Sequence, residues 1–282
     1  MEIELLLVPY DSARRSERMG AGPEALVTAG LPERLVQRGH RVRQTIIEPR
    51  ADSGRAEIRT SFELATLLAD AVRGARAARR FPLVLAGNCG VASGVCAGLG
   101  SDVMVLWADA HGDLNTPETT IGGFLDGMAL ATLTGRCWSG MAARIPGFTP
   151  VPEERIWLLG ARDLDPLEAD ALERSAIRRL PAQALDPHTV MAIADGARNN
   201  ASLYVHLDLD VLDASVGRAN AFAVPGGLSA EALVASCQML RQHAAPAAVT
   251  ISAYDPAVDV DRRASDVALR AVEALFGDAS VS

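Results

Sequence analysis

The sequence lacks several features that would assign a protein to a class at once. It contains no apolar run of the roughly 20 residues that a membrane-spanning helix needs, so we expect no membrane segment. It also lacks an excess of positive charge: 27 Lys and Arg against 35 Asp and Glu argue against nucleic acid as a partner. The cysteines form no CxxC pair and residues 1–18 lack a signal-peptide pattern, so we expect a reduced, cytoplasmic protein.

Short β-rich runs alternate with longer helical patterns along the chain. The expected strands cover residues 3–8, 42–47, 82–86, 103–108, 155–160, 203–208 and 248–252. The expected helices cover residues 23–38, 61–80, 91–99, 126–135, 165–175, 229–243 and 262–276. Several strands are apolar on both faces, which is typical of a parallel sheet covered by helices. The sequence predicts one α/β domain over residues 1–282, with ligands at the carboxyl ends of the strands.

Two acidic motifs follow expected strands. LWADAHGDLNTP carries Asp109, His111 and Asp113, and VHLDLDVLDAS carries Asp208 and Asp210. Residues two apart on a strand share a face, so each strand end would direct its acids into one crevice. Four carboxylates there repel one another unless cations neutralise them, and an oxygen-rich set with one imidazole suits Mn²⁺. A single motif of this kind is most often a cap or a surface loop, but two favour a pair of metal ions that activate water.

These motifs and three further segments resemble one known family. DAHGDLNTP and HLDLDVLDAS are similar to the two signatures of the ureohydrolases, the family of arginases and agmatinases. VPYDSARRSERMGAGPEAL, LGARDLDPLE and AVPGGLS are similar to other segments of that family. The resemblance covers nearly the whole chain. It implies a three-layer α/β/α sandwich that holds two Mn²⁺ and cleaves the guanidino group of a small molecule, releasing urea and an amine.

The resemblance also implies a role for each residue of the site. By position, the metal ligands would be Cys89, Asp109, His111, Asp113, Asp208 and Asp210. Asp109 and Asp208 would bridge both ions, and Asp113 would also pass a proton to the leaving amine. Asn115 would contact a substrate carboxylate and Asp165 an α-ammonium group. Those two contacts favour an amino-acid substrate over agmatine, which has no carboxylate.

Three positions depart from the family pattern. Cys89, in AGNCG, stands where the family has a histidine ligand of the buried metal. Asp126, in FLDGMAL, stands where arginases have a histidine thought to shuttle protons, so Asp126 is a second candidate catalytic residue. Ala253, in SAYDP, stands where a glutamate pairs with the guanidinium.

The cysteine and the missing glutamate both point to a weakly basic guanidine. A thiolate adds negative charge to the site, and Ala253 offers a cationic guanidinium no partner. An N-hydroxyguanidine fits, because its electron-withdrawing oxygen lowers its basicity. Cys89 together with LNTPETT also resembles the amidinohydrolases of D-cycloserine biosynthesis, an antibiotic pathway. Those enzymes act on Nω-hydroxy-L-arginine and release hydroxyurea.

Two other interpretations stay open on the sequence alone. Cys89, Asp126 and Ala253 are also what a catalytically silent relative that binds a ligand or a partner would show. A zinc deacylase on the same kind of scaffold is the other, although the NTP and RDLDP segments speak against it. Whether Cys89 binds metal and whether the protein forms a homo-oligomer are left open as well.

The remaining cysteines and one histidine are assigned to the interior. Free cysteines are among the most buried residues, so we expect Cys96, Cys137 and Cys237 in the core. We expect His206 to point away from the strand face that carries Asp208, and therefore away from the site.

Overall fold

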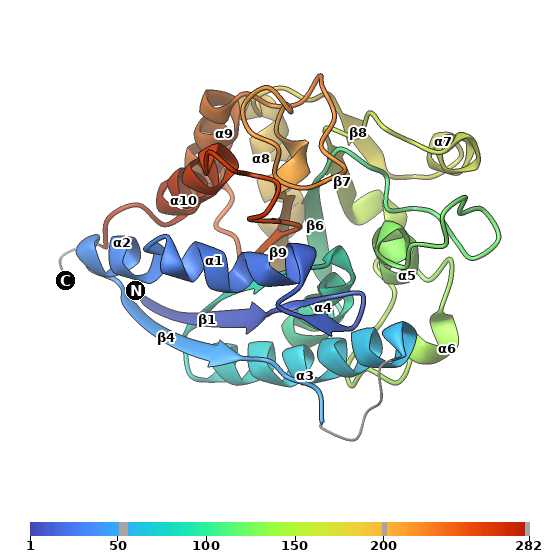
Figure 1. Ribbon diagram of the computed structural model, residues 1–282, viewed down its shortest axis with the longest axis horizontal. Coiled ribbons are helices and arrows are strands. Elements are labelled where there is room, and N and C mark those ends of the chain that lie inside the picture. Colours follow the sequence, from blue (N-terminus) through green and yellow to red (C-terminus); the bar gives the residue numbers. More distant parts are fainter. Residues whose placement is uncertain (51–55, 199–201, 280–282) are drawn as a thin grey trace.

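An eight-stranded parallel sheet forms the centre of the computed structural model, which describes residues 1–50, 56–198 and 202–279 (Figure 1). In sheet order its strands are β4 (Arg41–Ile46), β1 (Glu2–Val8), β5 (Phe81–Ala86), β10 (Ala248–Ser252), β9 (Ser202–Asp208), β6 (Val103–Ala108), β7 (Ile156–Leu159) and β8 (Arg178–Leu180). Every neighbouring pair is parallel, so all the carboxyl ends face one edge. The loops that follow β5, β10, β9 and β6 therefore meet there.

Helices cover both faces of this sheet and make the three-layer α/β/α architecture. They are α1 (Gly22–Thr28), α2 (Leu31–Gln37), α3 (Glu57–Ala77), α4 (Ala92–Leu99), α5 (Ala129–Leu133), α6 (Ser139–Ala142), α7 (Pro166–Glu173), α8 (Pro187–Arg198), α9 (Ala230–His243) and α10 (Arg263–Phe276). Helices α1, α2, α8, α9 and α10 pack on one face, and α3, α4 and α5 pack on the other (Figure 1). Within the described residues, no helix has the length and apolar character that crossing a membrane requires.

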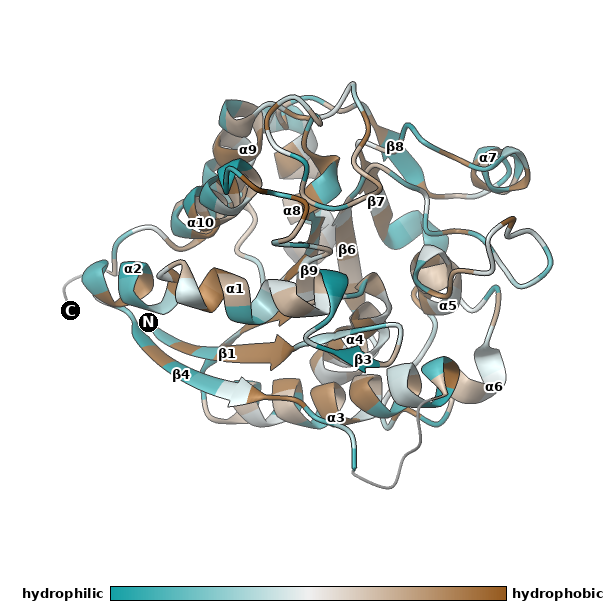
Figure 2. Cartoon of the chain, in the orientation of Figure 1, coloured by the Kyte–Doolittle hydropathy of each residue, from teal (hydrophilic) through white to brown (hydrophobic). Residues whose placement is uncertain are grey.

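The strands are apolar on both sides because each side faces a helical layer. Along β1, Leu5 and Leu7 belong to one core cluster, whereas Leu6 and Val8 belong to the other. Figure 2 shows β1 hydrophobic along most of its length. The continuous apolar runs of the sequence therefore predict a parallel sheet buried on both faces, and the structure confirms that prediction.

The predicted strands and most predicted helices are present, with shifted ends. The single helix expected over 23–38 is wrong: α1 and α2 are separate, because Gly30 between them adopts φ +96°, which a helix interior does not allow. Strand β8 and helix α8 were not predicted. The sequence of β8, RRL, is short and charged, as an exposed edge strand tolerates but an apolar-run search misses.

Candidate metal centre

The six side chains proposed as metal ligands lie at the carboxyl edge of the sheet. Asp109 directly follows β6, and Asp208 is the last residue of β9, which pairs with β6. Cys89 lies three residues beyond the end of β5. Because β10 alone separates β5 from β9, the parallel register brings the three loops together. The structure thus places the residues of both sequence motifs and the cysteine in one place.

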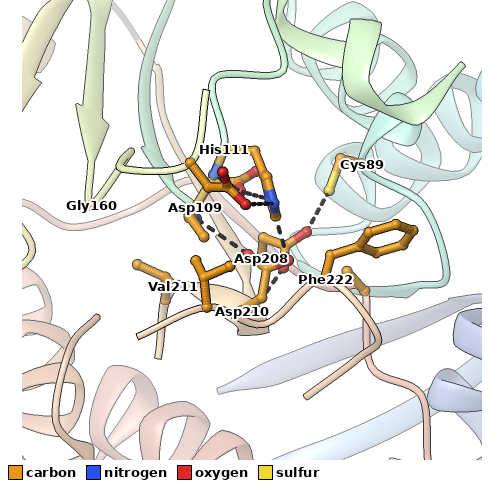
Figure 3. A network of polar contacts seen from close by, with 12 residues as sticks. Cys89, Asp109, His111, Gly160, Asp208, Asp210, Val211 and Phe222 are labelled. Atoms are coloured by element: carbon orange, nitrogen blue, oxygen red, sulfur yellow. Dashed lines mark hydrogen bonds and ion pairs between the residues drawn. The ribbon is translucent and has the colours of Figure 1, made fainter. Parts of the chain in front are cut away.

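One half of the centre is an ion-paired cluster of Asp109, His111 and Asp210 (Figure 3). Nδ1 of His111 lies 3.3 Å from Oδ1 of Asp109 and 3.4 Å from Oδ2 of Asp210. Burial by itself would lower the pKa of His111, but the two carboxylates raise that pKa to about 12. Burial would likewise raise the pKa of Asp210, yet its bonds with His111 lower it to about 2. The two carboxylates therefore favour a positive charge at the position of the imidazole.

The other half contains Cys89, Asp113 and Asp208, together with the shared Asp109. Sγ of Cys89 donates to Oδ2 of Asp208 at 3.0 Å (Figure 3). Burial first, and then the charge of Asp208, raise the pKa of the Cys89 thiol well above its usual value. Burial first, and then the charge of Asp109, do the same to the pKa of Asp113. Among the described residues, no cation faces this half as closely as His111 faces the first.

The donor set fits two divalent cations. Cys89, Asp109 and Asp113 offer ligand atoms within 4.8 Å of one another, and so do Asp109, His111 and Asp210, so Asp109 is common to both groups. Oδ2 of Asp113 is buried and has no hydrogen-bond partner. An unpartnered buried carboxylate oxygen is costly unless a cation binds it. Oxygen donors with one nitrogen and one sulfur can hold Mn²⁺, although sulfur is its least favoured donor.

A cavity of about 300 Å³ opens over these groups. Its wall includes Cys89, His111, Asp113, Asn115, Phe124, Asp126, Asp165, Asp208, Asp210, Phe222 and Ala253. The rings of Phe124 and Phe222 stack at 5.5 Å between centroids. Phe222 also meets the His111 ring edge-on. Two loops therefore contribute a pair of stacked aromatic rings to the cavity wall, beside His111.

Asn115 and Asp165, the two residues expected to read a substrate's amino-acid end, touch each other. Nδ2 of Asn115 donates to Oδ2 of Asp165 at 3.0 Å. Glu168 ties the two loops together, because it accepts the backbone N–H of Leu114 at 2.8 Å and that of Asp165 at 3.3 Å. The amide and the carboxylate thus lie side by side on the cavity wall, as carboxylate and ammonium groups on one carbon would require.

Comparison with known proteins identifies the family. A model of the arginase family matches residues 1–277. The chain belongs to the arginase family. It is 30% identical to the arginase of Brevibacillus brevis over 96% of each chain, and 28% identical to the arginase of Bacillus subtilis over 98% of this chain and 97% of that one. A crystal structure of arginase from Bacillus cereus superposes with a TM-score of 0.87, at 27% identity, over 99% of this chain and 100% of that one.

Membership of the arginase family defines the reaction class. The protein is a ureohydrolase, a hydrolase that acts on C–N bonds of guanidino compounds. Enzymes of this family in general depend on two manganese ions and bind small guanidino substrates. The two ligand groups around Asp109 are the candidate positions for such ions in this chain.

Asp126, one of the three departures from the arginase-family pattern, is fixed in the cavity wall. Its Oδ1 accepts the backbone N–H of Gly90 at 2.9 Å, and its Oδ2 accepts Nδ2 of Asn88 at 2.9 Å. Burial raises the pKa of Asp126 to about 7, against the lowering effect of these bonds. Ala253, the second departure, is buried and lines the same cavity with φ +59°.

Two residues that hold the site were missed by the sequence analysis. Asn220 donates to Oδ2 of Asp210 at 3.1 Å and to the backbone oxygen of Ala253 at 2.8 Å. The guanidinium of Arg162 donates to six backbone oxygens, those of Gly160, Asp210, Val211, Leu212, Val224 and Pro225. Arg162 is the Arg of the RDLDP segment, which was the only signal for it. It joins the loop after β7 to the loop after β9.

The prediction that His206 points away from the site is wrong. His206 and Asp208 are two residues apart on β9, and alternation therefore puts them on the same face. Nε2 of His206 is 3.1 Å from Oγ of Ser252, which is 3.3 Å from Sγ of Cys89. Burial lowers the pKa of His206 to about 3, so the ring is neutral. The other free cysteines, Cys96, Cys137 and Cys237, are buried, as predicted.

Proposed function

We propose that this chain hydrolyses the guanidino group of Nω-hydroxy-L-arginine, giving ornithine and hydroxyurea, with two Mn²⁺ held by Cys89, Asp109, His111, Asp113, Asp208 and Asp210. The observation that carries the choice of substrate is the pairing of a buried thiol in the ligand set with an alanine at position 253 of the cavity wall. Ala253 gives a guanidinium no counter-ion. A weakly basic N-hydroxyguanidine binds neutral and needs none.

Three buried carboxylates of the cavity wall, those of Asp126, Glu168 and Asp113, support this choice. Both oxygens of Asp126 are already hydrogen-bonded, and its pKa of about 7 leaves it partly neutral near physiological pH. Glu168 is engaged with two backbone N–H groups. Asp113 belongs to the proposed ligand set. None of these is a free, fixed anion of the kind that would select a cationic guanidinium.

The chain's own residues then share the work of the reaction. Asn115 and Asp165 hold the amino-acid end of the substrate. The distance from these two residues to the metal-ligand groups then sets which carbon of the substrate is attacked. Bound metal supplies an acidified water. Asp113, a member of the proposed ligand set, would accept a proton from the attacking water and return it to the departing ornithine nitrogen.

A substrate comparison tests the proposal. Protein loaded with Mn²⁺ is assayed with Nω-hydroxy-L-arginine, L-arginine and agmatine, and ornithine, urea and hydroxyurea are measured by mass spectrometry. We expect the highest kcat/KM for Nω-hydroxy-L-arginine and the lowest for agmatine, which offers Asn115 no carboxylate. A preference for L-arginine would overturn the substrate, and one bound zinc with no release of ornithine would favour the deacylase instead.

A further inference from the structure

A chain of buried polar groups lies behind Cys89. Its Sγ is 3.3 Å from Oγ of Ser252, and that oxygen is 3.1 Å from Nε2 of His206. Nδ1 of His206 is 2.8 Å from the hydroxyl oxygen of Tyr204, and that hydroxyl donates to Oγ1 of Thr250 at 2.8 Å. Ser252 is 1% exposed, and the side chains of His206, Tyr204 and Thr250 have no exposure. Polar groups this deep are kept only where they bond one another, and the direct contact with His206 fixes the Ser252 hydroxyl beside the sulfur.

The same imidazole also supports the shared ligand Asp109. The rings of His206 and Trp107 stack with 3.8 Å between centroids and 15° between planes. Nε1 of Trp107 donates to Oδ2 of Asp109 at 3.0 Å. The stacked pair therefore supports two of the proposed ligands. Trp107 bonds Asp109 directly, and His206 reaches Cys89 through Ser252. The proposed ureohydrolase reaction assigns no role to Trp107, His206 or Ser252.

We propose that Ser252, held in place by His206, positions the Cys89 sulfur as a metal ligand; this rests on the proposed ligand role of Cys89. A thiolate only accepts hydrogen bonds, so the Ser252 hydroxyl is the donor to it. Since that hydroxyl has one proton, the contact with His206 then requires an N–H at Nε2. Nδ1 of the neutral ring then accepts the Tyr204 hydroxyl, so metal binding at Cys89 moves the Tyr204 proton from Oγ1 of Thr250 to Nδ1 of His206. The bond draws charge from the sulfur, which partly offsets the negative charge that a thiolate brings to this acidic site.

Cobalt binding gives a readout that is independent of turnover. Thiolate bonded to Co²⁺ absorbs in the near ultraviolet, and a competing chelator gives the affinity. We expect Ser252→Ala and His206→Leu each to weaken Co²⁺ binding by about tenfold to hundredfold, the usual range for groups that support a ligand, and to shift the absorption band. His206→Gln keeps an N–H near the position of Nε2 and should recover part of the affinity.

Two controls separate positioning from packing. Thr250→Val changes a buried hydroxyl two residues from Ser252 on the same strand, in the same chain of bonds, and does not touch Cys89; it should leave the band and the affinity unchanged. In a Cys89→Ala background, Ser252→Ala should have no further effect on affinity, because the two residues act through one bond. Equal losses with and without Cys89, or an equal loss in Thr250→Val, would overturn the proposal.

The natural protein offers a second test that needs no variant to fold. With diamagnetic Cd²⁺ bound, ¹⁵N spectra of labelled histidine should show His206 with its proton on Nε2, and the proton on Nδ1 would contradict the inference. If Cys89→Ala left the Co²⁺ absorption band and the Co²⁺ affinity unchanged, Cys89 would not be a ligand and this proposal would be wrong. Loss of metal in Cys89→Ala without coupling to Ser252 would overturn the role of Ser252 alone and leave the proposed function standing.

Discussion

The two halves of the metal centre differ in how far the chain alone satisfies them. In the half around His111, the imidazole bridges Asp109 and Asp210, and backbone or Asn220 N–H groups complete both carboxylates. In the half around Cys89, the thiol is neutral and Oδ2 of Asp113 has no partner. The comparison teaches that one half is organised by the protein, whereas the other depends on a cation to complete it.

Asp208 belongs to the dependent half, and its loss should have the largest effect. Asp208→Ala should release both ions and abolish turnover, because the proposed bridging ligand is gone and the water is no longer acidified. Metal content by elemental analysis and ornithine release measure this. Asp213→Asn, which changes a carboxylate on the same loop that accepts the backbone N–H groups of Gly226 and Gly227, should keep both metals. Two tightly held ions in Asp208→Ala would refute the assignment.

Removing the ions should expose the difference between the halves directly. In chelated protein, His111→Ala leaves the buried charge of Asp210 unpaired and should cost about 3 kcal/mol of unfolding free energy, the lower end for breaking a buried ion pair. Cys89→Ala removes only a small neutral group and should cost about 1–2 kcal/mol. Urea denaturation of the two variants gives the ranking. A larger loss in Cys89→Ala would reverse the comparison.

Cys89→His makes the two halves alike and so tests what the thiol contributes. It removes one negative charge, and we expect metal retention about tenfold tighter with a partial shift of preference toward L-arginine. The shift should be larger in Cys89→His/Ala253→Glu than in either single variant, because both changes act on one site and need not add. The measurements are metal content and the ratio of kcat/KM for the two substrates. An unchanged ratio in Cys89→His would make the cysteine a bystander.

The smallest expected effect is a pH dependence of the metal-free protein. Burial raises the pKa of Asp126 to about 7 from its ordinary 3.8, so its stabilising protonated form is lost as pH rises through that window. Asp126→Asn stays neutral throughout. Its melting temperature should therefore gain on that of the natural protein between about pH 4 and pH 7, by a few degrees. A constant difference across the window would mean that the carboxyl is not perturbed.

Much of the site could be predicted because it follows from strand alternation and sheet topology. Asp109 and Asp208 follow apolar runs, and parallel strands carry their ends to one edge. The prediction for His206 was wrong because residues 206 and 208 are two apart on β9 and therefore share a face of the strand. Asn220 and Arg162 could not be predicted, since their partners are backbone oxygens and a carboxylate brought close only by the folded loops. Gly30 shows the same limit for the fold, because its apolar surroundings continue a helical pattern that its own φ ends.

The six-fold bonding of Arg162 has a consequence for how the protein moves. Its guanidinium is shared by the loop after β7 and the loop after β9, so neither loop can peel away without breaking bonds to the other. Segments coupled in this way open as one unit with a common free energy of local unfolding. The wall that carries Asp165 and the backbone that carries Asp210 would then be present together or absent together. The side of the cavity that these two loops form is therefore either whole or open to solvent.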